Sequence, residues 1–368
     1  MKVLTLFGTR PEIIRLSRII GLLDRFCTHL LVHTGQNYDA NLSDIFFQEL
    51  DVRPPDHHLG IQTESFADQV GQILARTGEI LAREQPDRLL ILGDTNSGLA
   101  AIVAARMGIP VYHMEAGNRC YDNRVPEETN RRVIDHCSTV LMPYTHRSKE
   151  NLVREGIPRQ RIFVTGNPIY EVLTHFDDRI EVSDVLARLD IVPEHFFLVT
   201  LHRAENVDQP ERLEMLFCGL DSVAQKYQQP VIVSLHPRTR DKLERFGLAP
   251  KSDHVRLMRP LGFFDFVKLE RTARCVLTDS GTVQEECAIS RIPNVTLRDV
   301  TERPETIEVG SNVLSGADAQ SVLRAVDLAL HAGRSWTPPP EYVEPDVSRT
   351  VAKIVLGYQH QPLLDTLS

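Results

Sequence analysis

The sequence predicts an α/β fold made of two Rossmann-like domains, each a parallel β-sheet wrapped by helices. A length of 368 residues is more than one hydrophobic core normally supports. With 42% hydrophobic and 25% charged residues, the composition is that of a folded globular chain. Short apolar runs alternate with amphipathic segments along the whole chain, and this alternation is typical of parallel sheets.

Two series of short β-branched or leucine-rich runs predict the strands, because many of the runs end in Gly, Asp or His and an amphipathic segment follows. The first series is 2–8, 29–35, 88–94, 110–115, 139–144 and 162–167. The second series is 196–202, 230–236, 254–258, 274–281 and 293–297. A polar, acidic stretch, 177–194, separates the two series and predicts a domain boundary near residues 168 to 190.

We therefore expect an N-terminal domain over residues 1–171 and a C-terminal domain over 172–346, with the ligand between them. A proline-rich stretch at 337–345 precedes a last helix at 347–358. In this assignment the segment 347–368 packs back on the N-terminal domain.

Charge and cysteine usage exclude several classes of function. The formal net charge of -9 argues against nucleic acid or an anionic membrane as the partner, because both require a positive field. No apolar run approaches the roughly 20 residues that cross a bilayer, and the start lacks a secretory signal. The six cysteines are scattered without a Cys-x-x-Cys pair, which predicts reduced thiols in a cytoplasmic protein with no bound metal.

Two turns between a strand and a helix are candidates for phosphate binding. In "GTRPE" (8–12), Pro11 is predicted as the first helical residue, so Arg10 lies beside a positive helix terminus, with Arg15 one turn further along. In "DSGTVQEE" (279–286), backbone N–H groups can hold a phosphate while a glutamate one turn further along, Glu285 or Glu286, can accept ribose hydroxyls. A capped turn without a ligand explains both segments nearly as well.

Other polar side chains end predicted strands, at the sheet edge where catalytic groups of such folds gather. Asp94 ends one strand, and His202 and His236 end two others, although a lone histidine at such a place is more often structural. The stretch "HMEAGNRCYDNRVPEETNRR" (113–132) crowds acidic residues against arginines. The pair His57-His58 is interpreted as a solvated turn.

Two familiar cofactor motifs are missing. No Gly-x-Gly occurs, and none of the seven lysines follows glycine in a Gly-Lys-Ser/Thr loop. The sequence therefore has neither a dinucleotide fingerprint nor a Walker phosphate loop.

Six motifs together resemble the non-hydrolysing UDP-N-acetylglucosamine 2-epimerase family: "GTRPE", "LGDT", "MEAG…PEETNR", "HRAEN", "DSGTVQEE" and "RDVTERPE". The match runs nearly end to end and in the right order. It implies a glycosyltransferase-B (GT-B) arrangement of two Rossmann-like domains with an interdomain cleft, and a homodimer. It also implies an isomerase that inverts carbon 2 of a UDP-N-acetylhexosamine without a cofactor, by eliminating UDP to a 2-acetamidoglucal and adding it back.

The resemblance assigns roles to matching positions. The acid/base candidates are Asp94, Glu115 and Glu127, and His202 would contact the departing diphosphate. The candidates for UDP binding are Arg10, Arg15, Ser280, Gly281, Thr282, Glu286 and Arg303, with Phe266 on the uracil side.

Some positions depart from the family pattern. Most members have lysine where Arg15 stands, and the segment 116–126 is shorter than usual. The segments "GNRCYDNRVPEE" and "PLGFFDF" look more like the branch that makes UDP-N-acetyl-L-fucosamine. The element linked to allosteric activation appears here as Gln36-Asn37-Tyr38-Asp39, which departs from the family form.

Three other functions fit the same pattern. A glycosyltransferase would use the same architecture to move the sugar to an acceptor. A hydrolysing 2-epimerase would release free sugar and UDP, and a UDP-sugar sensor would bind without turnover.

Overall fold

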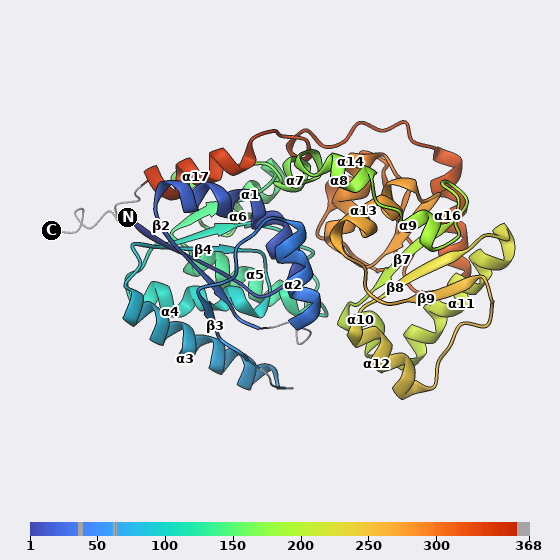
Figure 1. The fold of residues 1–368 in the computed structure, drawn as a ribbon, viewed down its shortest axis with the longest axis horizontal. Coiled ribbons are helices and arrows are strands. Elements are labelled where there is room, and N and C mark those ends of the chain that lie inside the picture. The colour runs from blue at the N-terminus through green and yellow to red at the C-terminus, as the bar shows by residue number, and fades with distance from the viewer. Residues whose placement is uncertain (36–39, 62, 64, 359–368) are drawn as a thin grey trace. The chain divides into compact units, whose positions relative to one another are not determined.

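The computed structural model describes residues 1–35, 40–61, 63 and 65–358, and it divides into two compact units. Unit 1 comprises Met1–Leu173 and the C-terminal segment that begins at Glu341, and unit 2 comprises Thr174–Pro340. Figure 1 shows that each unit is a twisted sheet covered by helices on its two faces.

Unit 1 contains a six-stranded sheet whose paired strands are all parallel, in the order β3-β2-β1-β4-β5-β6. Its strands are β1 (Lys2–Phe7), β2 (Thr28–His33), β3 (His57–His58), β4 (Arg88–Leu92), β5 (Val111–Met114) and β6 (Val140–Met142). Its helices are α1 (Arg10–Phe26), α2 (Ala40–Glu49), α3 (Phe66–Glu84), η1 (Asn96–Ala100), α4 (Ala101–Arg106), α5 (Pro126–Cys137), α6 (His146–Arg154), η2 (Arg159–Arg161) and α17 (Val347–Gly357). The helix α7 (Ile169–His175) and the short η3 (Pro340–Tyr342) lie where the chain passes from one unit to the other.

Unit 2 contains a second six-stranded parallel sheet, in the order β12-β11-β10-β7-β8-β9. Its strands are β7 (Phe197–Leu201), β8 (Val231–Leu235), β9 (Val255–Met258), β10 (Cys275–Thr278), β11 (Asn294–Thr296) and β12 (Asn312–Leu314). Its helices are α8 (Asp177–Glu181), α9 (Val185–Arg188), α10 (Ala204–Val207), α11 (Pro210–Tyr227), α12 (Pro237–Phe246), α13 (Phe263–Thr272), α14 (Gly281–Ser290), α15 (Pro304–Glu308) and α16 (Ala319–Ala332). Counted from its own first strand, each sheet has the order 3-2-1-4-5-6 of a Rossmann sheet, so the predicted fold class is confirmed.

Three strand predictions were wrong. The run 162–167 forms no strand. Its neighbour is the edge strand β6, which has only three residues, and the run pairs with it through a single isolated bridge between Ile162 and Leu141. The pair His57-His58, interpreted as a solvated turn, is the short edge strand β3, paired with Val32 and His33. The strand β12 was missed, because three residues at a sheet edge give no readable periodicity.

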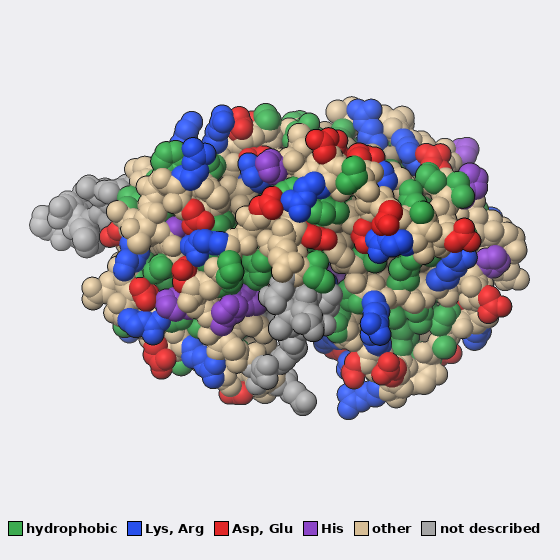
Figure 2. Space-filling view, viewed as in Figure 1, with side chains coloured by type: hydrophobic (Ala, Val, Ile, Leu, Met, Phe, Trp, Pro, Cys, Tyr) green, Lys and Arg blue, Asp and Glu red, His purple; other side chains and the backbone are tan. Residues whose placement is uncertain are grey.

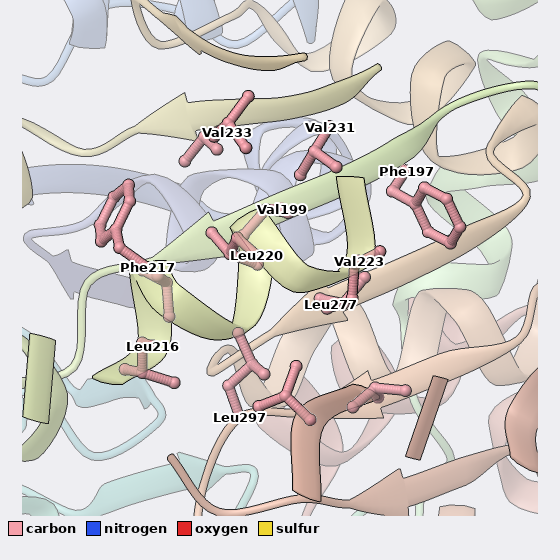
Figure 3. Packing of buried hydrophobic residues seen from close by; sticks show 14 of the residues in the cluster. Phe197, Val199, Leu216, Phe217, Leu220, Val223, Val231, Val233, Leu277 and Leu297 are labelled. Atoms are coloured by element: carbon pink, nitrogen blue, oxygen red, sulfur yellow. The ribbon is translucent and has the colours of Figure 1, made fainter. Parts of the chain in front are cut away.

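The core of unit 2 shows how the two layers hold together. In Figure 3, Phe217, Leu220 and Val223 of α11 point at sheet residues that include Val199 and Val233. All five side chains are buried. Truncating such a side chain to alanine typically costs about 2–5 kcal/mol, so this contact fixes the sheet from which the unit 2 site residues project.

The surface shows no large region of one charge on the face drawn in Figure 2, where acidic and basic side chains are interspersed. Among the residues described, no helix is both long and apolar enough to cross a membrane.

Candidate active site

Several predicted site residues follow the strands at which the order of each sheet reverses. This switch lies between β1 and β4 in unit 1 and between β7 and β10 in unit 2. Loops that leave the carboxyl ends of two such strands diverge and leave room for a ligand. Arg10 follows β1 and Asp94 follows β4, while His202 follows β7 and Ser280 follows β10.

The carboxylate of Glu12 links the loop after β1 to the loop after β4 by hydrogen bonds. Its Oε2 accepts hydrogen bonds from the N–H groups of Gly8 (2.6 Å) and Thr9 (2.7 Å), and its Oε1 accepts one from Thr95 Oγ1 (2.7 Å). Burial raises the pKa of Glu12 to about 7 against these hydrogen bonds. The sequence analysis missed Glu12, although its place in the first helical turn was a signal for a capping role.

Two arginines of α1 were predicted to bind the diphosphate. The helix begins at Arg10, with Thr9 as its N-cap. Pro11 is therefore the second helical residue, whereas the sequence predicted it as the first. The guanidinium of Arg10 lies 5.6 Å from the ring centroid of Phe46. Arg15 is only 1% exposed, which is unusual for arginine outside a binding or structural site.

Asp94 is held by the helix α5. Its Oδ2 accepts a hydrogen bond from Arg131 Nε at 2.8 Å, and its backbone carbonyl accepts one from Asn130 Nδ2 at 3.0 Å. Arg131 is almost fully buried, so its charge is poorly screened by water. These two hydrogen bonds therefore dock α5 on the loop after β4.

Glu115 lies directly after β5, next to the strand that carries Asp94, and its backbone is strained. It has φ +63, a left-handed conformation that is uncommon outside glycine. Its Oε1 accepts a hydrogen bond from Asn118 Nδ2 at 3.2 Å. Gly117 permits the tight turn, because a Cβ there would lie 2.3 Å from the carbonyl oxygen of Ser148. Such strain persists mainly where a structure has to aim one side chain.

A buried histidine that the sequence analysis did not select lies behind both carboxylates. His113 Nδ1 contacts Asp135 Oδ1 at 2.9 Å, and His113 Nε2 contacts the carbonyl oxygen of Gly93 at 2.9 Å. The ring therefore bridges Asp135 and the peptide that precedes Asp94. A histidine in a fully buried strand was the signal in the sequence.

Asp135 also accepts hydrogen bonds from the turn after β5. Its Oδ2 accepts hydrogen bonds from Arg119 Nη2 (2.7 Å) and the N–H of Gly117 (3.2 Å). Burial would raise the pKa of Asp135, but His113 and Arg119 outweigh burial and hold it below its usual value. Arg119 also pairs with Glu155 at 2.6 Å.

The acidic and basic residues of 113–132 are thus largely structural partners. Glu128 accepts hydrogen bonds from the N–H of Cys120 (3.0 Å) and from Arg131 Nη1 (2.8 Å), and it pairs with Arg132 at 3.2 Å. Burial opposes these contacts, yet they hold the pKa of Glu128 below its usual value. Its neighbour Glu127 is half-buried in the first turn of α5, the helix that is tied to Asp94.

In unit 2, one carboxylate organises the end of β7. Asp279 is fully buried and accepts hydrogen bonds from the N–H groups of His202 (3.0 Å) and Arg203 (2.9 Å) and from Asn206 Nδ2 (3.1 Å). His202 Nδ1 lies 3.2 Å from its Oδ1. Burial would raise the pKa of Asp279, but His202 and these donors hold it well below its usual range. His236 lies beside His202, with ring centroids 5.7 Å apart.

The first turn of α14 presents the predicted phosphate-binding groups. Ser280 is the N-cap but makes no side-chain capping hydrogen bond, and its Oγ lies 2.9 Å from Thr282 Oγ1. A Cβ at Gly281 would lie 3.5 Å from the guanidinium carbon of Arg303. Arg303 is buried and hydrogen-bonds Glu285. The structure therefore brings Ser280, Gly281 and Arg303 together.

The remaining candidates lie on two neighbouring helices. Glu286 is 5% exposed on α14. Phe266 lies on α13 and packs, half-buried, against the apolar cluster that contains Val283. The element Gln36–Asp39 lies outside the described residues.

Two further features of the molecule lie apart from these groups. A hollow of about 540 Å³ in unit 1 is lined by α6, residues 162–164 and α17, and contains none of the predicted residues. Within the described ranges, no three His, Cys, Asp or Glu side chains are grouped so that they could hold a metal ion.

Known proteins are similar to this chain in sequence and in fold. The family model for UDP-N-acetylglucosamine 2-epimerase matches residues 23–356. A UDP-N-acetylglucosamine 2-epimerase of Methanocaldococcus jannaschii is 41% identical over 349 residues, covering 92% of this chain and 95% of the relative. A UDP-2,3-diacetamido-2,3-dideoxy-D-glucuronate 2-epimerase of Pseudomonas aeruginosa is 37% identical over 335 residues, covering 90% of this chain and 92% of the relative.

A solved structure agrees with these relatives. The crystal structure of the M. jannaschii UDP-GlcNAc 2-epimerase in complex with UDP-GlcNAc and UDP matches with a TM-score of 0.92 at 40% identity, covering 96% of this chain and 99% of that one. The chain therefore belongs to the UDP-N-acetylglucosamine 2-epimerase family.

Proposed function

We propose that the protein is a non-hydrolysing 2-epimerase that inverts carbon 2 of a UDP-N-acetylhexosamine. The observation that carries this proposal is the pairing of family membership with carboxylates at the unit 1 switch point. Asp94 and Glu115 follow neighbouring strands, and Glu127 lies on the helix that is bonded to the Asp94 loop.

The chemistry of the substrate explains why carboxylates are needed. Carbon 2 bears an acetamido group and has no adjacent carbonyl, so its proton is not acidic enough for simple removal and return. In the proposed reaction the bond from carbon 1 to UDP breaks, a carboxylate takes the proton from carbon 2, and a 2-acetamidoglucal forms. UDP then adds back to carbon 1 while carbon 2 gains a proton on its other face. No oxidant or reductant is consumed.

Unit 2 supplies the nucleotide-binding part of the proposal. The departing diphosphate gains negative charge, which positive side chains and helix N-terminal N–H groups stabilise. His202, Arg303 and the first turn of α14 offer such groups. Within unit 1, Arg10 and Arg15 are the predicted UDP-binding arginines.

Deuterium exchange tests the proposed reaction. The protein is incubated in D₂O with a UDP-N-acetylhexosamine, without NAD or added metal, and followed by NMR. We expect deuterium at carbon 2 of both epimers. Exchange that strictly requires NAD would contradict the elimination route. Labelled sugar on an acceptor would indicate a glycosyltransferase, free sugar with UDP a hydrolysing enzyme, and an unchanged bound sugar a sensor.

The identity of the sugar is part of the same test. The named relatives act on substrates that differ at carbons 3 and 6 of the ring. We propose a UDP-N-acetyl-D-hexosamine or its 6-deoxy-L counterpart, the substrate of the branch that makes UDP-N-acetyl-L-fucosamine. A panel of both series under identical conditions ranks them by kcat/KM.

We further propose that the protein is a homodimer in the cytoplasm. All six cysteines are free thiols, which supports a reducing compartment. Light scattering of the purified protein measures the subunit number directly. A monomer mass at working concentration would contradict the dimer.

A further inference from the structure

A chain of hydrogen-bonded charged side chains lies beside the first turn of α14 in unit 2. Arg298 is 1% exposed and Glu302 is 4% exposed, and both lie in the segment between β11 and α15. Arg298 Nη1 donates a hydrogen bond to Glu302 Oε2 at 2.8 Å. Arg203 Nη2, from the loop after β7, donates one to Glu302 Oε1 at 3.2 Å. Each oxygen of the Glu302 carboxylate is thus held by an arginine.

The oxygen that accepts from Arg203 also borders the first turn of α14. A Cβ at Gly281 would lie 3.4 Å from Glu302 Oε1, so the same atom contacts the Arg203 guanidinium and the edge of this turn. The backbone of Arg203 is fixed at the same place, because its N–H donates to Asp279 at 2.9 Å and Asp279 directly precedes the N-cap Ser280. Arg203 therefore lies next to the N–H groups that are the candidate phosphate ligands.

The far end of this chain is anchored and its near end can be reached. Arg298 Nε donates a hydrogen bond to Glu205 Oε1 at 3.1 Å, and Glu205 lies on α10, the helix that follows Arg203. The side chain of Arg203 is 14% exposed, against 2% for that of Glu302. Holding a long side chain in one place before a ligand arrives removes a rotamer cost that binding would otherwise carry.

We propose that Arg203 is a further cation for the diphosphate of the UDP group, and that Glu302, held by Arg298, is the positioning residue that keeps the Arg203 guanidinium beside the first turn of α14. The inference rests on the proposed function, because a diphosphate at that turn is part of it. A guanidinium suits this role, since one nitrogen can donate to Glu302 while another donates to a phosphate oxygen. Neither Arg203 nor Glu302 is among the positions to which the family resemblance assigns a role.

The contact between Arg203 and phosphate is tested with Arg203→Met and two ligands, UDP by calorimetry and uridine by NMR titration. Methionine removes the charge and the donors, so we expect UDP affinity to fall about 10-fold or more, the usual effect of losing a hydrogen bond between charged groups. Uridine has no phosphate, so its Kd should stay within about twofold. An unchanged Kd for UDP, or an equal loss for both ligands, would overturn the proposal.

Arg212→Met is the matched control. Arg212 also pairs with a carboxylate of the segment 298–303, Asp299 at 3.2 Å, but it extends from α11, and its side chain is 18% exposed. We expect the Kd for UDP to stay within about twofold. A loss as large as that of Arg203→Met would mean that removing any cation from this segment weakens binding, which contradicts a specific contact.

The positioning role of Glu302 is tested by a double-mutant cycle that combines Glu302→Gln with Arg203→Met. Glutamine has only one oxygen, so it cannot accept from both arginines as the carboxylate does. Loss of the Glu302 charge also relieves its repulsion of phosphate, but this gain is common to both backgrounds and cancels in the cycle. We expect the factor by which Glu302→Gln changes UDP affinity to be less favourable with Arg203 than with methionine, by about fivefold or more. The same factor in both backgrounds would remove Glu302 from this role.

Unfolding in denaturant, followed by circular dichroism, confirms that each variant is folded before its affinity is compared. If Glu302→Gln does not fold, Glu302→Asp takes its place in the cycle, because aspartate keeps the charge but is too short to hold both arginines. If the native protein binds UDP and exchanges deuterium while Arg203→Met is unchanged, only the role of Arg203 and Glu302 is lost. Without UDP binding by the native protein, the proposed function fails first.

Discussion

Unit 1 and unit 2 each bury a carboxyl group completely, but they stabilise it in opposite ways. Asp135 of unit 1 receives His113, Arg119 and a backbone N–H, and stays ionised. In the described part of the chain neither carboxyl oxygen of Glu270 in unit 2 receives a hydrogen bond, and burial raises the pKa of this group well above its usual value. The comparison teaches that burial alone does not decide the charge of a carboxyl group, because the donors around it do.

The largest effect is expected from removing the ionised group. Asp135→Asn leaves His113 and Arg119 with less compensation in a buried site, and breaking a buried pair of this kind costs about 3–5 kcal/mol of unfolding free energy. Denaturant unfolding followed by circular dichroism measures the loss. Asp122→Asn is the control, because its partner Arg124 is exposed and the pair should contribute less than about 1 kcal/mol. A similar loss in both variants would break the comparison.

The next effect separates the chemistry of unit 1 from the binding of unit 2. Glu115→Gln and Glu127→Gln should each lower kcat by about 10², or about 2.7 kcal/mol, because an amide cannot transfer the carbon 2 proton. UDP affinity should stay within a few-fold. Glu286→Gln should do the reverse and mainly weaken UDP binding. Near-normal turnover in either unit 1 variant would remove that residue from the catalytic set.

A smaller effect concerns the pH dependence of stability. The pKa of Glu12 rises from 4.5 to about 7 on folding, so the folded protein binds more protons in this window. The contribution of Glu12 is therefore full below pH 4.5 and is lost as the pH rises through about 7. From pH 5 to pH 8 the native protein should lose on the order of 1–3 kcal/mol more than Glu12→Gln does. Parallel stability curves for the two proteins would contradict this prediction.

The smallest effect is expected at the buried carboxyl group that receives no hydrogen bond in the described part of the chain. Glu270→Met removes this polar group and keeps most of its volume, so no hydrogen bond to a donor is lost. We expect the unfolding free energy to change by less than about 1 kcal/mol, against the large loss for Asp135→Asn. A loss above 3 kcal/mol would indicate that Glu270 is ionised and paired in a way that the comparison excludes.

The sequence predicted most of the fold because parallel strands that are buried on both faces give long apolar runs. It also selected Asp94, Glu115 and Ser280 as candidates, and the structure places each of them within two residues of the end of a strand. It missed Glu12, His113 and Glu270, whose importance depends on partners that are brought near only by folding. The edge strands β3 and β12 were missed for a different reason, because two or three residues are too few to show the alternation of a strand.

The last helix has a practical consequence for dissecting the chain. The helix α17 buries Val347, Val351 and Val355, and Arg88 and Tyr112 of unit 1 donate hydrogen bonds to the backbone at Val355 and Tyr358. A fragment cut after Leu173 would expose the apolar groove that these valines fill. Expression of unit 1 by itself therefore requires a gene in which a short linker replaces Thr174–Pro340 and joins Leu173 to Glu341.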